Sequence, residues 1–300
     1  MNEERFARVG ELDLCYQVFG DDQAPALLLV MGLGSQMILW EDEFCAALSG
    51  HGLRVVRFDN RDIGRSTILR QSRPPTLRQL VLRDPRGAAY SLDDMAADAA
   101  GLLDQLGIDA AHVVGASMGG MIAQLIALNH PERVRSLVSI MSTTGNRRVG
   151  RPRPNMIPRL IRRRPGGRER WIEDQVQTLR AIGSEVYPTD VDRLRALSAC
   201  CYDRGHDRAG PARQLAAIQT AADRTAKLKQ LRLPATVIHG REDQLVTPSG
   251  GRATAQAIPG ARLVMLEAMA HDLPRPLWPQ ILDAILANVA DASPSPPART

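Results

Sequence analysis

The sequence has little cysteine, no long hydrophobic run and no leader-like start, and each shortage excludes a class of protein. Its four cysteines stand at Cys15, Cys45, Cys200 and Cys201, without a CxxC motif or any other spacing typical of a metal site. We therefore expect free thiols in a reducing compartment, the cytoplasm, and no bound metal. The longest apolar runs, such as 26–31, are far too short to cross a bilayer, and the N-terminus has no apolar signal segment. We expect no membrane partner.

Aromatic residues are also scarce, at 4% of the chain, although the formal net charge is +5. The positive excess is arginine, and it is concentrated at 147–170. This stretch is rich in proline and glycine and has almost no aromatic side chain on which bases could stack. We therefore expect a solvated surface segment and no nucleic-acid partner. Attraction of an acidic substrate is the alternative.

Apolar residues, by contrast, make up 44% of the 300 residues, which is ample for one large core. Two amphipathic helical patterns occur, at 92–106, with Ser91 as N-cap and Gly107 as its end, and at 118–129. Residues 12–18 alternate with period 2, which predicts an antiparallel edge strand or hairpin. Strands alternating with helices predict an α/β fold, a mostly parallel twisted sheet with helices on both faces. Six short runs that are apolar on both faces are typical of buried parallel strands: 26–31, 53–58, 111–115, 134–140, 235–238 and 261–266.

The alternation of strands and helices is interrupted between 143 and 220. An Arg-, Pro- and Gly-rich stretch is followed there by amphipathic helical patterns, with no apolar strand. We therefore expect residues 143–220 to form a helical cap or lid inserted into the core. The core then has two parts, 1–142 and 221–289. The last segment, 290–300, is rich in Ser, Pro and Ala and is expected to be a disordered tail.

The sequence GASMG at 115–119 stands between a predicted strand and the predicted helix 118–129. A G-x-S-x-G pattern at a strand-to-helix turn predicts a nucleophile elbow. The serine takes a strained backbone conformation there, so the residues two before and two after it must lack side chains. Because the helix begins at the serine, its N-terminal amides favour negative charge at that point. Ser117 is therefore the predicted nucleophile.

A serine hydroxyl needs a base, and four histidines follow Ser117 in the chain. His130 ends a helix, where a structural histidine is common, and His206 lies in the predicted insertion. His239 directly follows an apolar strand, which favours a packed side chain. His271 lies in a loop just past the last predicted strand. The chain order serine, acid, histidine that goes with a nucleophile elbow makes His271 the predicted base.

The supporting acid is expected on the loop after the preceding strand, which covers 240–248. That loop offers Asp243, with Glu242 as its rival. An acid after the strand 134–140 is excluded, because no carboxylate follows that strand directly. Asp272 adjoins the histidine in sequence and cannot easily orient its ring. Asp243 is therefore the predicted acid.

A tetrahedral intermediate needs two amide donors aimed at its oxyanion. We predict the N–H of Met118, directly after the nucleophile, and the N–H of Leu33, in the glycine-containing loop after the strand 26–31. The alternative for these glycines is a simple tight turn. Methionine adapts to varied shapes, although it is equally a core residue. The predicted substrate-binding groups near the site are Met31, Gly32, Met141, Val246 and Met269.

Taken together, the motifs resemble those of one known family. The runs LLLVMGLG, DNRDIGRST, HVVGASMGG and HGREDQLVTP, with the final His271, are similar to the α/β-hydrolases grouped with aclacinomycin methylesterase. The charged DNRDIGRS segment at 59–66 we interpret as a hydrogen-bonded structural loop rather than a catalytic one. Relatives commonly have His where this chain has Met31, and Gly where it has Ala270, but neither change removes a catalytic group. The resemblance implies the α/β-hydrolase fold and a carboxylic ester hydrolase that needs no cofactor.

The expected function is that of a serine esterase that acts through an acyl-enzyme on a small, largely apolar ester. A lactonase, a thioesterase or a cofactor-free haloperoxidase are alternatives on the same scaffold. Dehalogenases and epoxide hydrolases of this fold use an aspartate nucleophile, so Ser117 argues against them. A small-molecule receptor that retains the triad is an alternative from another class. Its chemistry would stop after a single turnover. The oligomeric state is expected to be a monomer or a homodimer.

Overall fold

The computed structural model describes residues 3–161, 165–188 and 190–292. They form a sheet of eight strands in the order β1-β2-β4-β3-β5-β6-β7-β8. Strand β2 runs antiparallel to both its neighbours, β1 and β4, and all the other pairs are parallel. The strands are β1 Arg5–Val9, β2 Leu12–Phe19, β3 Ala26–Val30, β4 Arg54–Phe58, β5 Ala111–Ala116, β6 Val134–Ile140, β7 Ala235–Gly240 and β8 Arg262–Leu266. The predicted antiparallel hairpin and mostly parallel α/β sheet are confirmed.

Eleven helices lie in the described part of the chain. Their bounds are α1 Asp42–Ser49, α2 Leu77–Leu82, α3 Leu92–Gln105, α4 Met118–Asn129, α5 Ile157–Ile161, α6 Arg168–Ile182, α7 Val191–Arg204, α8 Gly210–Thr220, α9 Thr225–Leu228, α10 Ser249–Ala257 and α11 Trp278–Asp291. Helix α11 runs past the predicted start of the tail, and residues 293–300 of that tail lie outside the described residues. As predicted, Ser91 caps α3, and its side chain accepts from the N–H of Asp94.

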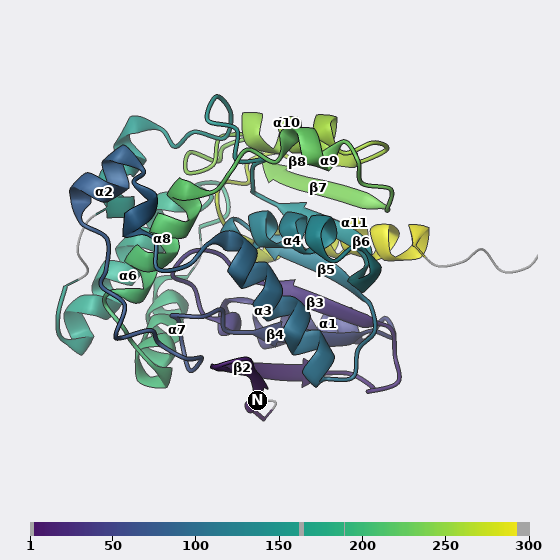
Figure 1. The fold of residues 1–300 in the computed structure, drawn as a ribbon, viewed down its shortest axis with the longest axis horizontal. Helices are drawn as coiled ribbons and strands as arrows, with labels where there is room; N and C mark the ends of the chain where they lie inside the picture. Colours follow the sequence, from purple (N-terminus) through teal and green to yellow (C-terminus); the bar gives the residue numbers. More distant parts are fainter. Residues whose placement is uncertain (1–2, 162–164, 189, 293–300) are drawn as a thin grey trace, which may run out of the picture.

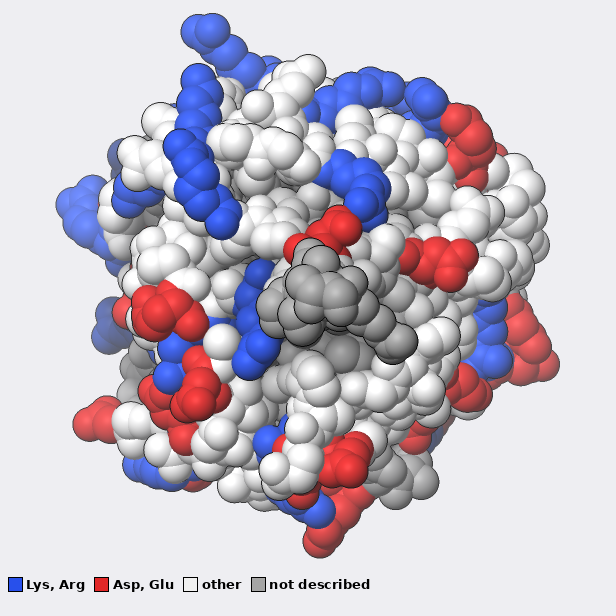
Figure 2. All heavy atoms as spheres, turned by 90° about the vertical axis from the view of Figure 1, so that its right-hand side faces the viewer, with Lys and Arg blue, Asp and Glu red and all other residues white. Residues whose placement is uncertain are grey.

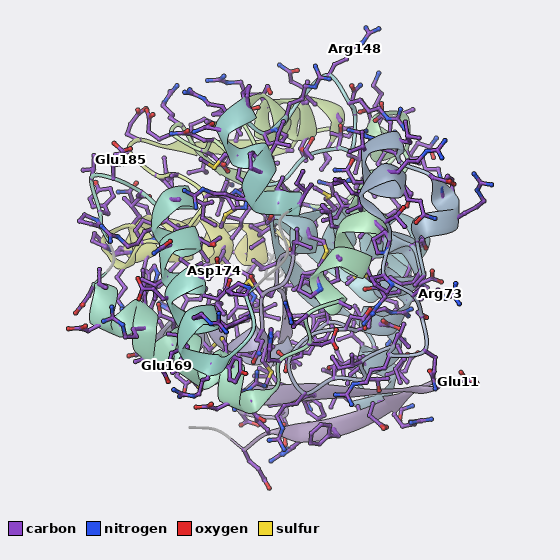
Figure 3. The ribbon with its side chains drawn as sticks, turned by 90° about the vertical axis from the view of Figure 1, so that its left-hand side faces the viewer. Glu11, Arg73, Arg148, Glu169, Asp174 and Glu185 are labelled. Atoms are coloured by element: carbon purple, nitrogen blue, oxygen red, sulfur yellow. The ribbon has the colours of Figure 1, made fainter. Side chains whose placement is uncertain are left out.

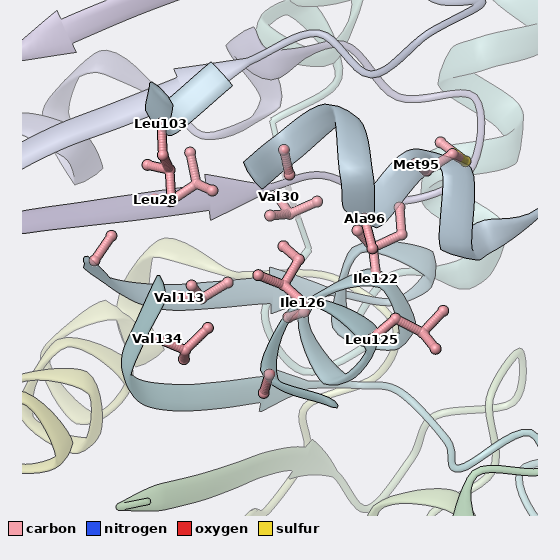
Figure 4. Packing of buried hydrophobic residues seen from close by; sticks show 14 of the residues in the cluster. Leu28, Val30, Met95, Ala96, Leu103, Val113, Ile122, Leu125, Ile126 and Val134 are labelled. Carbon is pink, nitrogen blue, oxygen red and sulfur yellow. The ribbon is translucent and has the colours of Figure 1, made fainter. Parts of the chain in front are cut away.

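The core has two halves, one on each face of the sheet (Figure 1). Neighbouring residues of a strand point to opposite faces, so Leu28 and Val30 of β3 pack under α3 and α4, as Figure 4 shows. Leu27 and Leu29 of the same strand pack on the other face with α1 and α11. All five residues of β3 are buried. This explains why its sequence is apolar throughout instead of alternating.

Strand β8 departs from the prediction. The run 261–266 is predicted to be buried on both faces, and this is wrong, because β8 is the last strand of the sheet. It pairs only with β7, and Arg262 and Leu263 at its start are exposed. An edge strand has no neighbour on one side, so its apolar residues are only partly covered.

Between β6 and β7 the described residues form helices α5 to α9 and no strand. Figure 1 shows α6, α7 and α8 together at the end of the sheet to which the parallel strands point, beside α2. Trp171, Ile172 and Val176 of α6 pack with Leu194 and Cys201 of α7 in a small cluster of their own. Ligand sites of open parallel sheets lie at this end of the strands.

His112 of β5 gives the fold a specific pH dependence. Its ring is buried, and Nδ1 lies 2.8 Å from the Ser136 hydroxyl. Burial, and then the nearby Arg135, lower its pKa from 6.5 to about 4. The native state therefore keeps this ring neutral while the unfolded chain takes up a proton, so stability is lost as the pH falls from 6.5 towards 4.

We expect the free energy of unfolding of the wild type to fall by about 3 kcal/mol more than that of His112→Gln between pH 7 and pH 4. Glutamine keeps a polar group beside Ser136 but cannot be protonated. Urea titrations of both proteins at a series of pH values measure the difference. Parallel pH curves would contradict the assignment.

Candidate active site

Ser117 stands at the sharp turn between β5 and α4. Its backbone has φ 57° and ψ −119°, a region that non-glycine residues rarely adopt. A Cβ at Gly115 would clash with the backbone of Gly119, and one at Gly119 would clash with the backbone of Val30. The two glycines of the motif are thus required by the close approach of α4 to β3 and β5. The N–H of Ser117 donates to Ile140 O at 2.9 Å, which fixes the turn on β6.

The structure brings Ser117 together with the predicted base and acid. His271 lies in the loop after β8, and its Nε2 is 3.0 Å from Ser117 Oγ. Its Nδ1 is 2.7 Å from Oδ2 of Asp243, which lies in the loop after β7. A buried carboxylate accepts a hydrogen bond from Nδ1–H, so Nε2 is left as the acceptor for the serine hydroxyl. The three side chains therefore form a continuous hydrogen-bonded chain, although Ser117 and His271 are 154 positions apart in the sequence.

Asp243 is held as a carboxylate. It is 1% exposed, and its Oδ1 accepts from the N–H groups of Leu245 and Val246, each at 2.9 Å. Burial alone would raise the pKa of Asp243, but His271 and hydrogen bonds from His239 and His271 hold that pKa well below its usual range. A permanent negative charge is thus placed where a protonated His271 ring would need it.

His239 has a part that the sequence did not indicate. It is fully buried, as the strand-end prediction requires. Its Nε2 lies 2.7 Å from Val246 O and 3.5 Å from Asp243 Oδ2. A carbonyl accepts only, so Nε2 carries the proton, and this N–H lies near Oδ2, the same oxygen that His271 Nδ1 contacts. The four-residue spacing of His239 and Asp243 around the turn after β7 is the sequence feature that could have indicated this contact.

The rival residues lie elsewhere. Glu242 is exposed, and its backbone N–H donates to Met269 O. Asp272 accepts from the Ser184 hydroxyl and backbone N–H, and burial raises its pKa although these hydrogen bonds act to lower it. His206 stacks on Tyr202 with ring centroids 4.9 Å apart. The Ser117 hydroxyl lies against His271 Nε2 instead.

The two predicted oxyanion donors flank the nucleophile. Met118 is the first residue of α4, so its N–H belongs to the helix-end amides without an intrahelical partner. Gly32 is so near that a Cβ there would lie 3.1 Å from Ser117 Cβ, which puts the loop of Leu33 against the serine. The next amide, that of Gly34, donates to Gln214 Oε1 at 2.8 Å. The amide of Gly34 is thus engaged within the protein, and the assignment of the Leu33 N–H as the second donor stays a prediction.

Helix α8 is hydrogen-bonded to the loop that follows β3 and contains Gly32, Leu33 and Gly34, which we call the oxyanion loop. Gln214 is fully buried, accepts from Gly34 N and donates from Nε2 to Arg61 O at 2.8 Å. The neighbouring Arg213 makes a buried bidentate salt bridge with Asp62, with N···O distances of 2.8 and 2.7 Å. The amide of Gln214 thus joins the loop after β3 to the loop after β4. A rigid joint of this kind holds backbone donors in place before the substrate arrives.

We expect Gln214→Ala to lower kcat by about tenfold with little change in KM, because the oxyanion loop loses its orientation while the substrate pocket stays. Steady-state kinetics on a soluble ester measure this split. The matched control is Gln219→Ala on the same helix, which is expected to leave both constants within twofold. An equal loss in both variants would assign the effect to the helix as a whole.

The loop that contains His271 is likewise hydrogen-bonded to a helix between β6 and β7. The backbone N–H of His271 donates to Ile182 O at 2.9 Å, and that of Ala270 donates to the Ser184 hydroxyl at 2.9 Å. Ile182 and Ser184 lie at the end of α6. The helical segment between β6 and β7 therefore contacts both the oxyanion loop and the loop of the base.

The charged loop 59–66 is hydrogen-bonded and structural, as the sequence indicated. Asp59 is fully buried and accepts from Met37 N at 2.7 Å and from Arg204 of α7 at 2.9 Å. Asn60 Nδ2 donates to Met31 O at 3.0 Å. These bonds connect α7 and the oxyanion loop to the end of β4.

The predicted substrate-binding residues are placed unevenly. Gly32 adjoins Ser117, whereas Met31, Met141 and Met269 pack in the core half that contains α1 and α11. Val246 is buried and accepts from His239. A cavity of about 40 Å³ lies between the oxyanion loop and the helices α6 and α7, and its lining includes Ser35, Leu39, Trp171, Leu179, Cys201 and His206. Sequence reasoning missed these lining residues, both those of the loop after β3 and those of α6, α7 and the segment after α7, since no local motif marks them.

A serine, a histidine and a carboxylate in this order and geometry define a hydrolase-type site. The family model described as alpha/beta hydrolase fold matches residues 25–274. The chain therefore belongs to the α/β hydrolase fold family, as its motifs predicted.

Three relatives illustrate the range of the family. Rhodomycin D methylesterase DauP of Streptomyces sp. (strain C5) is 30% identical over 302 residues, which cover 94% of this chain and 97% of the relative. The pimeloyl-(acyl-carrier protein) methyl ester esterase of Aeromonas hydrophila subsp. hydrophila is 28% identical, with 83% and 89% covered. The crystal structure of the enol-lactonase from Burkholderia xenovorans LB400 has a TM-score of 0.73 at 27% identity, with 95% and 100% covered.

Proposed function

We propose that this protein is a carboxylic ester hydrolase that works through an acyl-enzyme on Ser117, with His271 as base and Asp243 as the supporting acid. The observation that carries the proposal is the hydrogen-bonded chain from Ser117 Oγ through both ring nitrogens of His271 to Asp243. Such a chain lets a neutral imidazole take the serine proton as attack begins.

In the first half of the proposed cycle, Ser117 Oγ attacks the ester carbonyl while its proton passes to His271 Nε2. The carbonyl oxygen becomes an oxyanion and accepts from the N–H groups of Met118 and Leu33. The positive end of α4 adds to this stabilisation. The C–O bond to the alcohol then breaks, and His271 returns the proton to the leaving oxygen. The acyl group stays on Ser117.

In the second half, water takes the place of the alcohol. His271 removes a proton from the water, the hydroxyl oxygen attacks the acyl carbonyl, and the same two amides hold the oxyanion. Collapse releases the carboxylic acid and returns the proton to Ser117. Asp243 keeps the ring in one tautomer and stabilises it whenever it is charged.

We further propose a methyl ester of a larger, largely apolar acid as the substrate class. Two differently named relatives, the rhodomycin D methylesterase and the pimeloyl-(acyl-carrier protein) methyl ester esterase, act on methyl esters. This supports a substrate whose alcohol part is small. A lactone is the second candidate, supported by the enol-lactonase of similar structure. Its ring would open by the same steps and give a hydroxy acid.

The segment 143–220 we propose as the cap of this enzyme, with core parts 1–142 and 221–289. Helices α6 and α7 cover the oxyanion loop with a small apolar cluster, which supports a lid. The cavity of about 40 Å³ beneath these helices is far smaller than the roughly 300–1,000 Å³ of small-molecule sites. Its lining does not include Ser117 or His271, so the proposed cap moves to admit substrate to the triad. A cytoplasmic location is part of the proposal, and the four unpaired cysteines support it.

Steady-state hydrolysis of p-nitrophenyl esters and of methyl esters tests the proposal, with intact-mass measurement of an acyl adduct in the rapid phase. Sustained turnover with a transient adduct on Ser117 is the expected result. A single burst that stops would favour a triad-retaining receptor. Hydrolysis of lactones with no turnover of open esters would favour the second candidate.

A further inference from the structure

The arginine-rich stretch that follows β6 does not stand alone in the folded chain. Its residues Arg147 and Arg151 lie close enough to Arg83, at the end of α2, to act on it electrostatically. Burial and then these two like charges lower the pKa of Arg83. Segments 64 residues apart in sequence thus bring guanidinium groups together. Like charges held side by side weaken the fold, which points to a use for the cluster.

We call the residues 73–87 and 146–153 the basic rim. They include eight arginines and a single acidic residue, Asp84, whereas the whole chain carries a net charge of only +5. Asp84 is paired with Arg86 at 2.8 Å. In Figure 3, Arg148 lies at the top and Arg73 at the right edge of this face, and Glu169 and Glu185 lie on its left. The face on the right of Figure 1, by contrast, shows both signs interspersed (Figure 2).

The basic rim also has an apolar component. Leu77, Val81 and Leu82 of α2 are 57%, 66% and 64% exposed. A helix within a domain normally turns such residues to the core, yet α2 presents them to solvent. The helix is nevertheless well formed, because Thr76 and Gln79 make a reciprocal capping box. Arg78 and Arg83 adjoin these aliphatic residues in the chain.

The basic rim borders the site on two sides. The N–H of Arg153 donates to the carbonyl of Gln244, the residue after Asp243, at 2.8 Å. Helix α2 packs on α8, the helix that carries Gln214. Anything that binds the basic rim is thereby held beside the loops of the acid and of the oxyanion donors.

We propose that the basic rim is a docking surface for an anionic lipid layer. Anionic headgroups accept hydrogen bonds from arginine, and aliphatic side chains beside them enter the acyl boundary, so a lipid surface matches both features at once. Leu77 and Val81 project from a short helix, which suits a fluid layer better than a rigid protein partner, while Leu82 lines an open hollow together with Arg78 and Arg86. Contact of this kind is peripheral. No helix in the described ranges is long and apolar enough to cross a membrane.

Flotation of the full chain with phosphatidylcholine vesicles, with and without phosphatidylglycerol, tests the proposal at low and at high salt. We expect binding to the anionic vesicles that weakens as salt is added. The variant with Arg78, Arg147, Arg148 and Arg151 all changed to glutamine should bind about 600-fold more weakly, at roughly fivefold per arginine. Val81→Asn with Leu82→Asn should lose roughly tenfold.

The matched control removes the same charge elsewhere, through glutamine at the exposed Arg5, Arg135, Arg232 and Arg262. We expect it to bind vesicles as the wild type does, and all variants to hydrolyse a short soluble ester at the wild-type rate. Equal losses in the control and the basic-rim variant would overturn the proposal. So would binding of polyglutamate without binding of anionic vesicles, or a dimer that the Val81 and Leu82 changes dissociate without vesicle binding. Vesicle binding is read without any ester, so its failure leaves the proposed hydrolase activity untouched.

Discussion

Replacement of Ser117 by alanine is expected to lower kcat/KM for ester hydrolysis by about 10⁴-fold or more. The hydroxyl is the only group at the turn between β5 and α4 that can form the acyl bond, and without it the base and oxyanion donors have no reaction to assist. The measurement is steady-state hydrolysis of a p-nitrophenyl ester at neutral pH. Intact mass after the reaction should show no acyl adduct on the variant.

The backbone at Ser117 supplies a control on folding. Alanine is as strained as serine at φ 57°, so the free energy of unfolding should change little. Ser117→Gly should be as inactive but more stable by about 1 kcal/mol, because glycine adopts positive φ without strain. A Ser117→Ala variant that retains turnover would require another nucleophile, and the acyl-enzyme proposal would be abandoned.

Exchange of Asp243 for asparagine is expected to lower kcat by about 10³- to 10⁴-fold. Asparagine still accepts from the N–H groups of Leu245 and Val246, so the loop keeps its shape. Its amide, however, presents a donor to His271 Nδ1. The ring proton then shifts to Nε2, which faces Ser117 and can no longer accept. Rates of acylation measured by stopped flow report this loss directly.

Glu242→Gln is the matched test for this assignment. It removes one charge from the same loop, but at an exposed side chain, and is expected to leave kcat within twofold. A large loss in Glu242→Gln with a small one in Asp243→Asn would reverse the choice between the two acids.

The local patterns predicted those features that depend on few neighbours in sequence. Strand β3 is recognisable because a strand buried on both faces must be apolar at every position. The turn at Ser117 is recognisable because α4 approaches β3 and β5 so closely that only glycine fits at 115 and 119. Strand β8 was misjudged for the same local reason, since an apolar run does not tell whether a further strand or helix covers it.

Contacts between distant segments could not be predicted. Gln214 is one of several glutamines in the chain, and nothing around it indicates a bond to Gly34, 180 residues away. The same holds for Ser184 and the loop of His271. The arginines of 147–153 were interpreted as a solvated surface, because their partner in the basic rim, Arg83, lies far off in sequence.

The sequence by itself determined the class of fold, the nucleophile turn and the order of serine, acid and histidine, because strand periodicity, glycine spacing and chain order are properties of short segments. Only the tertiary structure decided how those residues are used. It set His271 between Ser117 and Asp243 and tied α6 and α8 to the two loops of the site. It also gathered the arginines of the basic rim beside α2. These depend on packing and on hydrogen bonds between segments that the sheet brings together.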